Sequence, residues 1–83
     1  MQVVCEYSPY GRSSWIITTG DLQVFHLHPL NFAYSRLYYV YDHTEGNLLG
    51  GLYAKDTEGS IKYSFRKWLK GGYHEESMQQ DQR

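Results

Sequence analysis

The sequence predicts a small all-β domain, in which about six short antiparallel strands form a barrel or a sandwich with one short helix at most. Two observations carry this prediction. Runs of β-branched and aromatic residues recur along the chain, and clusters containing Gly, Pro, Asp or Asn separate them. A chain of 83 residues is also the size of one domain. We place that domain in residues 1–73.

The amino-terminal half contains three expected strands, over residues 2–7, 14–19 and 22–28. A turn containing Pro9 and Gly11 separates the first two strands. Gly20 and Asp21 form a two-residue turn of the kind that joins tight hairpins. Pro29 ends the third strand, and residues 31–35 fit either a helical turn or a loop.

The carboxyl-terminal half predicts a three-stranded meander over residues 36–42, 48–55 and 60–66. The triplet Thr-Glu-Gly occurs at 44–46 and again at 57–59, each time after an Asp. Both copies fit hairpin loops of three to five residues with Gly in the left-handed conformation. Residues 37–41 are uncharged and strongly β-prone, so we expect a central strand or the core of a homodimer interface there.

Residues 60–70 also suit an amphipathic helix, and this gives the alternative fold, α+β with a helix at 60–70. The buried face of that helix would consist of Ile61, Phe65, Trp68 and Leu69. Against it, Ile61, Tyr63 and Phe65 alternate with polar residues, as in a strand. Because a Gly-containing turn precedes the segment, we expect the strand. Residues 74–83 are polar and Gln-rich, and they predict a flexible tail.

Composition restricts the partners. Eight Lys and Arg against nine Asp and Glu argue against a general nucleic-acid binder. The single Cys excludes an intramolecular disulfide, and no apolar run approaches the ~20 residues that a membrane span needs. We therefore expect a cytoplasmic protein with no membrane partner. A homodimer is a natural way for so short a chain to bury more surface.

No residues predict catalysis, a cofactor or a metal. His26 and His28 would share one face of a strand, but no third ligand has a recognisable spacing, so we predict no metal site. Cys5 lies in an apolar run and is expected to be an inert core residue. Gly50 and Gly51 indicate a bulge, a bend or a close approach of a neighbour.

The meander register predicts a partner-binding face. If the other side of the strands forms the core, one face carries a group of Tyr and basic residues. These candidates are Arg36, Tyr38, Tyr53, Lys62 and Arg66. The core set opposite them is Leu37, Tyr39, Tyr41, Leu48, Leu52, Ile61, Tyr63 and Phe65. A covered second apolar layer is the competing interpretation of the same face.

Nine Tyr in so short a chain favour a surface that contacts another molecule. We expect a non-enzymatic binding module, a small inhibitor or regulator that docks on a larger protein with an acidic surface. The alternative is a single-stranded nucleic-acid-binding module, in which rings stack on bases and cations contact phosphates. A small metal-dependent or Cys-dependent enzyme ranks third.

Overall fold

The computed structural model describes residues 1–8, 11–30 and 35–71, which form five β-strands and one α-helix. The elements are β1 (Gln2–Glu6), β2 (Ser14–Thr18), β3 (Val24–Pro29), β4 (Leu37–Asp42), β5 (Leu48–Tyr53) and α1 (Glu58–Lys70). The strands are antiparallel and lie in the order β1-β2-β3-β4-β5, so each strand pairs with its neighbour in sequence.

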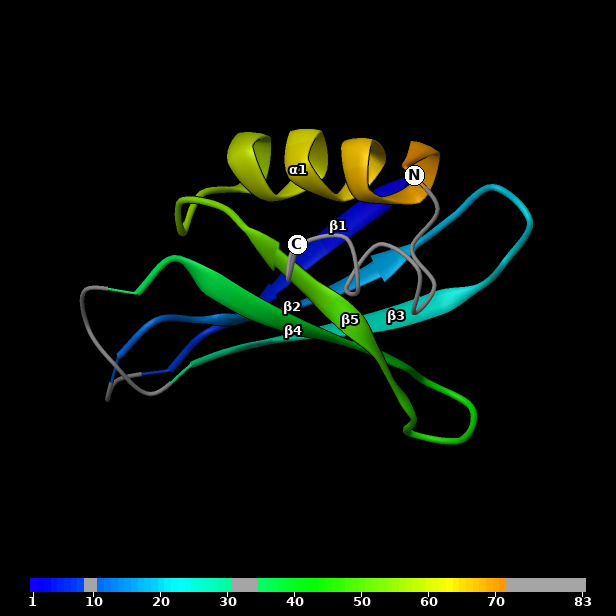
Figure 1. The fold of residues 1–83 in the computed structure, drawn as a ribbon, viewed down its shortest axis with the longest axis horizontal. Coiled ribbons are helices and arrows are strands. Elements are labelled where there is room, and N and C mark those ends of the chain that lie inside the picture. The colour runs from blue at the N-terminus through cyan, green and yellow to red at the C-terminus, as the bar shows by residue number, and fades with distance from the viewer. Residues whose placement is uncertain (9–10, 31–34, 72–83) are drawn as a thin grey trace, which may run out of the picture.

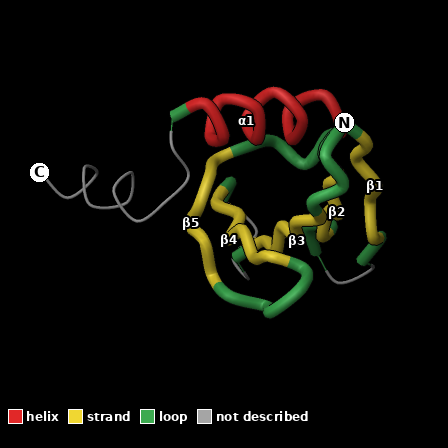
Figure 2. Tube along the Cα trace, turned by 90° about the vertical axis from the view of Figure 1, so that its right-hand side faces the viewer, coloured by secondary structure: helices red, strands yellow, loops and turns green. Residues whose placement is uncertain are grey.

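The sheet is strongly curved, and α1 lies across its concave side (Figure 1). In the view along the strands, the helix spans the opening between β1 and β5 (Figure 2). The helix contacts both of these edge strands, while the two strands do not pair with each other. The expected barrel or sandwich of about six strands is therefore an open five-stranded sheet covered by a helix, close to the α+β alternative.

The core fills the space between the concave side of the sheet and α1. Ten residues form it: Trp15, Ile17, Phe25, Leu27, Tyr38, Val40, Leu52, Ala54, Ile61 and Phe65. The helix contributes Ile61 and Phe65, both fully buried. Its Phe65 ring lies with its centroid 5.0 Å from that of Phe25 and 5.4 Å from that of Trp68. Burial of these rings is the main stabilising contact between the two layers.

The pairing register shows which side of each strand faces the helix. Trp15 pairs with Leu27, and Leu27 pairs with Val40, so these three form an inner row. Tyr38 also points inward, paired with Leu52. The predicted core assignment was therefore wrong for β4, where Leu37, Tyr39 and Tyr41 lie on the outer face. Because every position from 37 to 41 is apolar or aromatic, alternation in β4 could not indicate which set is buried.

β4 lies between β3 and β5 and is hydrogen-bonded on both sides. The prediction that residues 37–41 form a central strand is confirmed. The pairing of β4 with β5 shifts register between Val40 and Tyr41, as the Gly pair in β5 indicated. A Cβ atom on Gly51 would lie 3.2 Å from Leu37 Cδ1, so the neighbouring side chain approaches the backbone closely here.

The two Thr-Glu-Gly triplets have different structures. The first lies in the loop between β4 and β5, and Gly46 has a φ of 75°, as predicted. The second begins α1: Thr57 is the N-cap, and its side chain accepts a hydrogen bond from the Ser60 N–H. The predictions of a hairpin at 57–59 and a strand at 60–66 were wrong. The helix is favoured because it buries Ile61 and Phe65 together against the sheet.

Smaller differences remain at the ends of elements. The turn after β2 is longer than two residues and includes Leu22 in the left-handed region, with a φ of 66°. Residues 31–34 and the predicted tail at 74–83 lie outside the described part of the chain. Within the described part, α1 is the one helix, and its 13 residues are too few and too polar to cross a bilayer.

The two triplet glycines should respond oppositely to Ala substitution. Gly46→Ala places a side chain at positive φ and should lower the free energy of unfolding by about 1 kcal/mol. Gly59→Ala lies in a helix with open space around the new Cβ, and it should raise stability by about 0.5–1 kcal/mol. Urea unfolding followed by circular dichroism measures both changes. A loss of stability in Gly59→Ala would contradict the helical start at residue 58.

Ala substitutions at Phe65 and Tyr63 distinguish the helix from the predicted strand, because a strand over residues 60–66 would place both side chains in the core. In α1 Phe65 is fully buried, whereas the Tyr63 side chain is 64% exposed. Phe65→Ala should therefore cost about 3–5 kcal/mol of unfolding free energy. Tyr63→Ala should change it by about 0.5 kcal/mol or less. Equal losses, measured by urea titration of Trp fluorescence, would favour the strand register.

Candidate functional site

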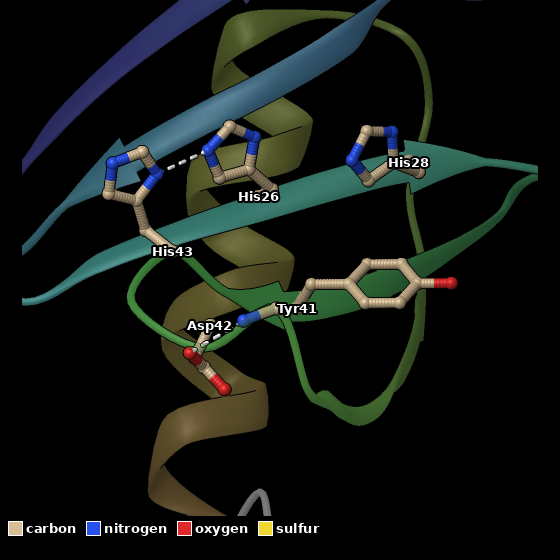
Figure 3. Close-up of a pocket in the computed structure, with 6 residues that line it drawn as sticks. His26, His28, Tyr41, Asp42 and His43 are labelled. Atoms are coloured by element: carbon tan, nitrogen blue, oxygen red, sulfur yellow. Dashed lines mark hydrogen bonds between the residues drawn. The ribbon is translucent and has the colours of Figure 1, made fainter.

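The outer face of the sheet is the candidate site. Cross-strand pairs place Ile16 beside His26, His26 beside Tyr41, and His28 beside Tyr39 on this face. Helix α1 lies behind the sheet as seen from these side chains (Figure 3). Within the described residues, no helix or other strand packs on the outer face. A row of aromatic and imidazole rings therefore borders solvent.

Three imidazoles lie in line along this face (Figure 3). The rings of His26 and His43 stack with centroids 4.9 Å apart, and those of His26 and His28 lie 5.8 Å apart. His26 Nε2 and His43 Nδ1 are 2.7 Å apart, so one of these nitrogens donates a hydrogen bond to the other. The Tyr41 ring meets the His28 ring edge-on, with centroids 5.3 Å apart. This arrangement presents ring faces and ring nitrogens together on the outer side of β3 and β4.

A shallow hollow of about 460 Å³ lies along this row. Its lining consists of His26, His28, Tyr41, Asp42, His43 and Gly46. The Asp42 carboxylate accepts hydrogen bonds from the backbone N–H groups of Glu45, Gly46 and Asn47. These bonds, that from Glu45 above all, hold the pKa of Asp42 below its usual value. Asp42 is thus ionised at neutral pH, and its carboxylate is held by the N–H groups of the turn that follows β4.

The sequence predicted part of this arrangement. His26 and His28 share one face of a strand, as their spacing indicated. His43 was missed because it lies beyond β4 and reaches His26 only through the pairing of β3 with β4. Among the described residues, no group of three or more His, Cys, Asp and Glu side chains is placed to hold a metal ion.

The five predicted partner-binding residues do not form one face. Tyr38 is fully buried in the core, which corrects its assignment to the surface. Tyr53 is 71% exposed on the outer face, where it pairs with Leu37. Arg36 is exposed just before β4. Lys62 and Arg66 belong to α1, on the other side of the sheet from the outer face.

The structure therefore separates the aromatic and basic residues that the sequence analysis placed together. None of the five strands contains a Lys or an Arg. Helix α1 contains four, Lys62, Arg66, Lys67 and Lys70. Apart from the imidazoles, the charged side chain at the outer-face positions of the five strands is consequently Glu6.

At the concave side, Asp56 organises a partly buried polar network. One oxygen, Oδ1, accepts hydrogen bonds from Trp15 Nε1 and from the Tyr38 hydroxyl, each at 2.9 Å. The other, Oδ2, accepts one from the Ser13 backbone N–H at 3.1 Å. The Arg12 guanidinium lies 4.4 Å from the centre of the Tyr38 ring and donates a hydrogen bond to the Ala54 carbonyl oxygen. We assign this network a structural role, because the core residues Trp15 and Tyr38 require partners for their polar atoms.

The network shifts two pKa values in opposite directions. Partial burial acts to raise the pKa of Asp56, but the bonds from Ser13, Trp15 and Tyr38 together with the Arg12 charge lower it below its usual value. Burial, followed by the hydrogen bond to the Asp56 carboxylate and its charge, raises the pKa of Tyr38 to about 12. Tyr38 thus remains a hydrogen-bond donor across the physiological range.

Cys5 is exposed on the edge strand β1, so the expectation that it lies in the core was wrong. It pairs with the buried Trp15, but β1 has a neighbouring strand on one side only, which leaves Cys5 less covered than Trp15.

In comparisons with known proteins, no family model, no curated protein and no solved structure matches this chain.

The raised pKa of Tyr38 predicts a loss of stability at alkaline pH. An unfolded Tyr ionises near pH 10, whereas Tyr38 in the folded protein ionises near pH 12. Its contribution to stability is therefore complete below pH 10 and is lost as the pH rises from 10 to about 12. Tyr38→Phe should remove this part of the decline in the urea midpoint, and Tyr39→Phe on the outer face should retain it. A wild-type decline in Tyr38→Phe would contradict the assignment.

Proposed function

We propose that this protein is a non-enzymatic binding module that docks on a larger protein through the outer face of its sheet. The observation that carries the proposal is that, among the described elements, the sheet is covered on its concave side only. Helix α1 covers the concave side, while a face rich in Tyr, His and aliphatic side chains borders solvent. A small chain of this kind suits an inhibitor or a regulator of its partner.

The exposed side chains of this face are those that contribute most to protein interfaces. Tyr53 is 71% exposed, and Leu48 and Val4 are 55% and 54% exposed. His28 is exposed beside Tyr41. The solvated face of an antiparallel sheet ordinarily carries polar residues, so this composition is unusual for a face that contacts only water. Tyr gives a large contact area with few rotamers to restrict on binding.

The charges favour a protein partner over a single-stranded nucleic acid. Stacked bases would suit Tyr41 and His28, but nucleic-acid affinity depends on cations that contact phosphates. The strands contain no Lys or Arg, and Glu6 adds negative charge to the outer face. The strands therefore offer no Lys or Arg side chain that could form a salt bridge to a phosphate beside the rings of Tyr41 and His28.

The hollow also gives little support to an enzyme. Its described lining includes imidazoles that could move a proton, but no Ser, Thr, Cys or Lys that could act as a nucleophile. His26 and His43 are already hydrogen-bonded to each other. Contact with a partner requires none of these groups, which makes binding the simpler use of the face.

The test is affinity capture from native lysate with and without nuclease, followed by titration of the purified partner. Tyr53→Ala should weaken binding about tenfold or more, a loss of ~1.4 kcal/mol. Tyr7→Ala is the matched control, because Tyr7 is 81% exposed but lies beyond the end of β1. Circular dichroism checks that both variants fold.

Three results would count against the proposal. Nuclease-sensitive capture would assign the face to nucleic acid. Equal affinity of Tyr53→Ala and the wild-type protein would place the binding surface elsewhere. Self-association as the sole binding event, seen by analytical ultracentrifugation, would identify the partner as a second copy of the chain.

A further inference from the structure

We propose that the solvent-facing side of α1 is a second docking surface, which binds an acidic segment of a partner protein. We call this surface the basic helix face; it consists of Lys62, Tyr63, Arg66, Lys67 and Lys70. It lies on the far side of the molecule from the outer face of the sheet (Figure 2). The proposal stands independently of the function proposed for the outer face.

Helical spacing places an aromatic ring at the centre of this surface. Arg66 and Lys67 follow Tyr63 by three and four residues, and Lys70 follows it by seven, so all lie on one side of α1. Ile61 and Phe65 lie on the opposite, buried side. The Tyr63 side chain is 64% exposed, and the Lys67 ammonium is 5.6 Å from the centre of its ring.

Helix stability explains only some of the residues of the basic helix face. Cations in the last turn of a helix interact favourably with its dipole, which accounts for Lys67 and Lys70. Lys62 and Arg66 lie earlier in α1, and an exposed Tyr contributes little to helix stability. Among residues 1–8, 11–30 and 35–71, the recorded charge contact of these cations is that of Lys67 with the Tyr63 ring.

The charge of the chain is strongly segregated. Four cations and Glu58 give α1 a net charge of +3, whereas the whole chain is at −1, which leaves −4 for all other residues. A local positive surface on a protein of negative net charge selects for a local negative partner surface. It also disfavours long polyanions, because their remaining charges are repelled by the rest of the molecule.

An acidic protein segment satisfies each feature of the surface. Arg66 can bind a carboxylate through two parallel hydrogen bonds, and the Lys ammonium groups add longer-range attraction. Tyr63 adds an exposed ring beside these cations, against which an apolar side chain of the segment can pack. The helix of 13 residues is about 20 Å long, which matches a short peptide segment.

The test uses the intact protein and a short fluorescein-labelled peptide composed of Glu and Leu, with oligothymidylate of similar charge as the second probe. Fluorescence anisotropy gives both affinities at low and at physiological salt. The variants are Arg66→Glu, Arg66→Gln and Tyr63→Ala. Lys55→Glu is the control, because Lys55 is exposed in the loop before α1 and the substitution changes the net charge by the same amount as Arg66→Glu.

Arg66→Glu should weaken peptide binding at least about tenfold, and Arg66→Gln and Tyr63→Ala about threefold or more each. Lys55→Glu should change it less than about twofold. Three results would overturn the proposal: undetectable peptide binding at low salt, equal weakening by Lys55→Glu and Arg66→Glu, or tighter binding of oligothymidylate than of the peptide. Circular dichroism of each variant separates lost binding from lost folding.

Discussion

The position of the helix depends on the hydrogen bonds that the Asp56 carboxylate accepts. Asp56 lies in the short loop from β5 to α1, and its three hydrogen bonds reach the start of β2 and the start of β4. They tie the loop across the concave side of the sheet. They also satisfy the indole N–H of Trp15 and the hydroxyl of Tyr38, which would otherwise be buried without partners. The aromatic core and the direction of α1 are therefore fixed together.

The position of the helix decides what the rest of the surface can do. β4 has apolar or aromatic side chains on both sides, and α1 covers Tyr38 and Val40. Tyr39 and Tyr41 are consequently left on the outer face, beside His26 and His28. The same division separates charge, because four cations lie on α1 and none lies in a strand. One nearly uncharged aromatic face and one basic face follow from a single packing arrangement.

The two Thr-Glu-Gly triplets show how far local sequence determines local structure. Asp42 lies two residues before its triplet, and its carboxylate binds the N–H groups of the same turn. Asp56 lies directly before its triplet, and its carboxylate binds residues more than forty positions away, as well as Tyr38. The first arrangement is local and could be predicted. The second requires β2 and β4 to be in place, so the triplet alone could not distinguish a hairpin from a helix N-cap.

The five strands, each to within two residues at either end, could be predicted from local sequence, and so could the shared face of His26 and His28. These features depend on alternation and turn residues within a few positions of each other. Only the tertiary structure decided that residues 58–70 are helical, that Tyr38 is buried, and that His43 meets His26. Residues 60–70 fit both a period of two and a period of 3.6. The choice depends on which surface packs against them, and that surface is built from strands distant in the sequence.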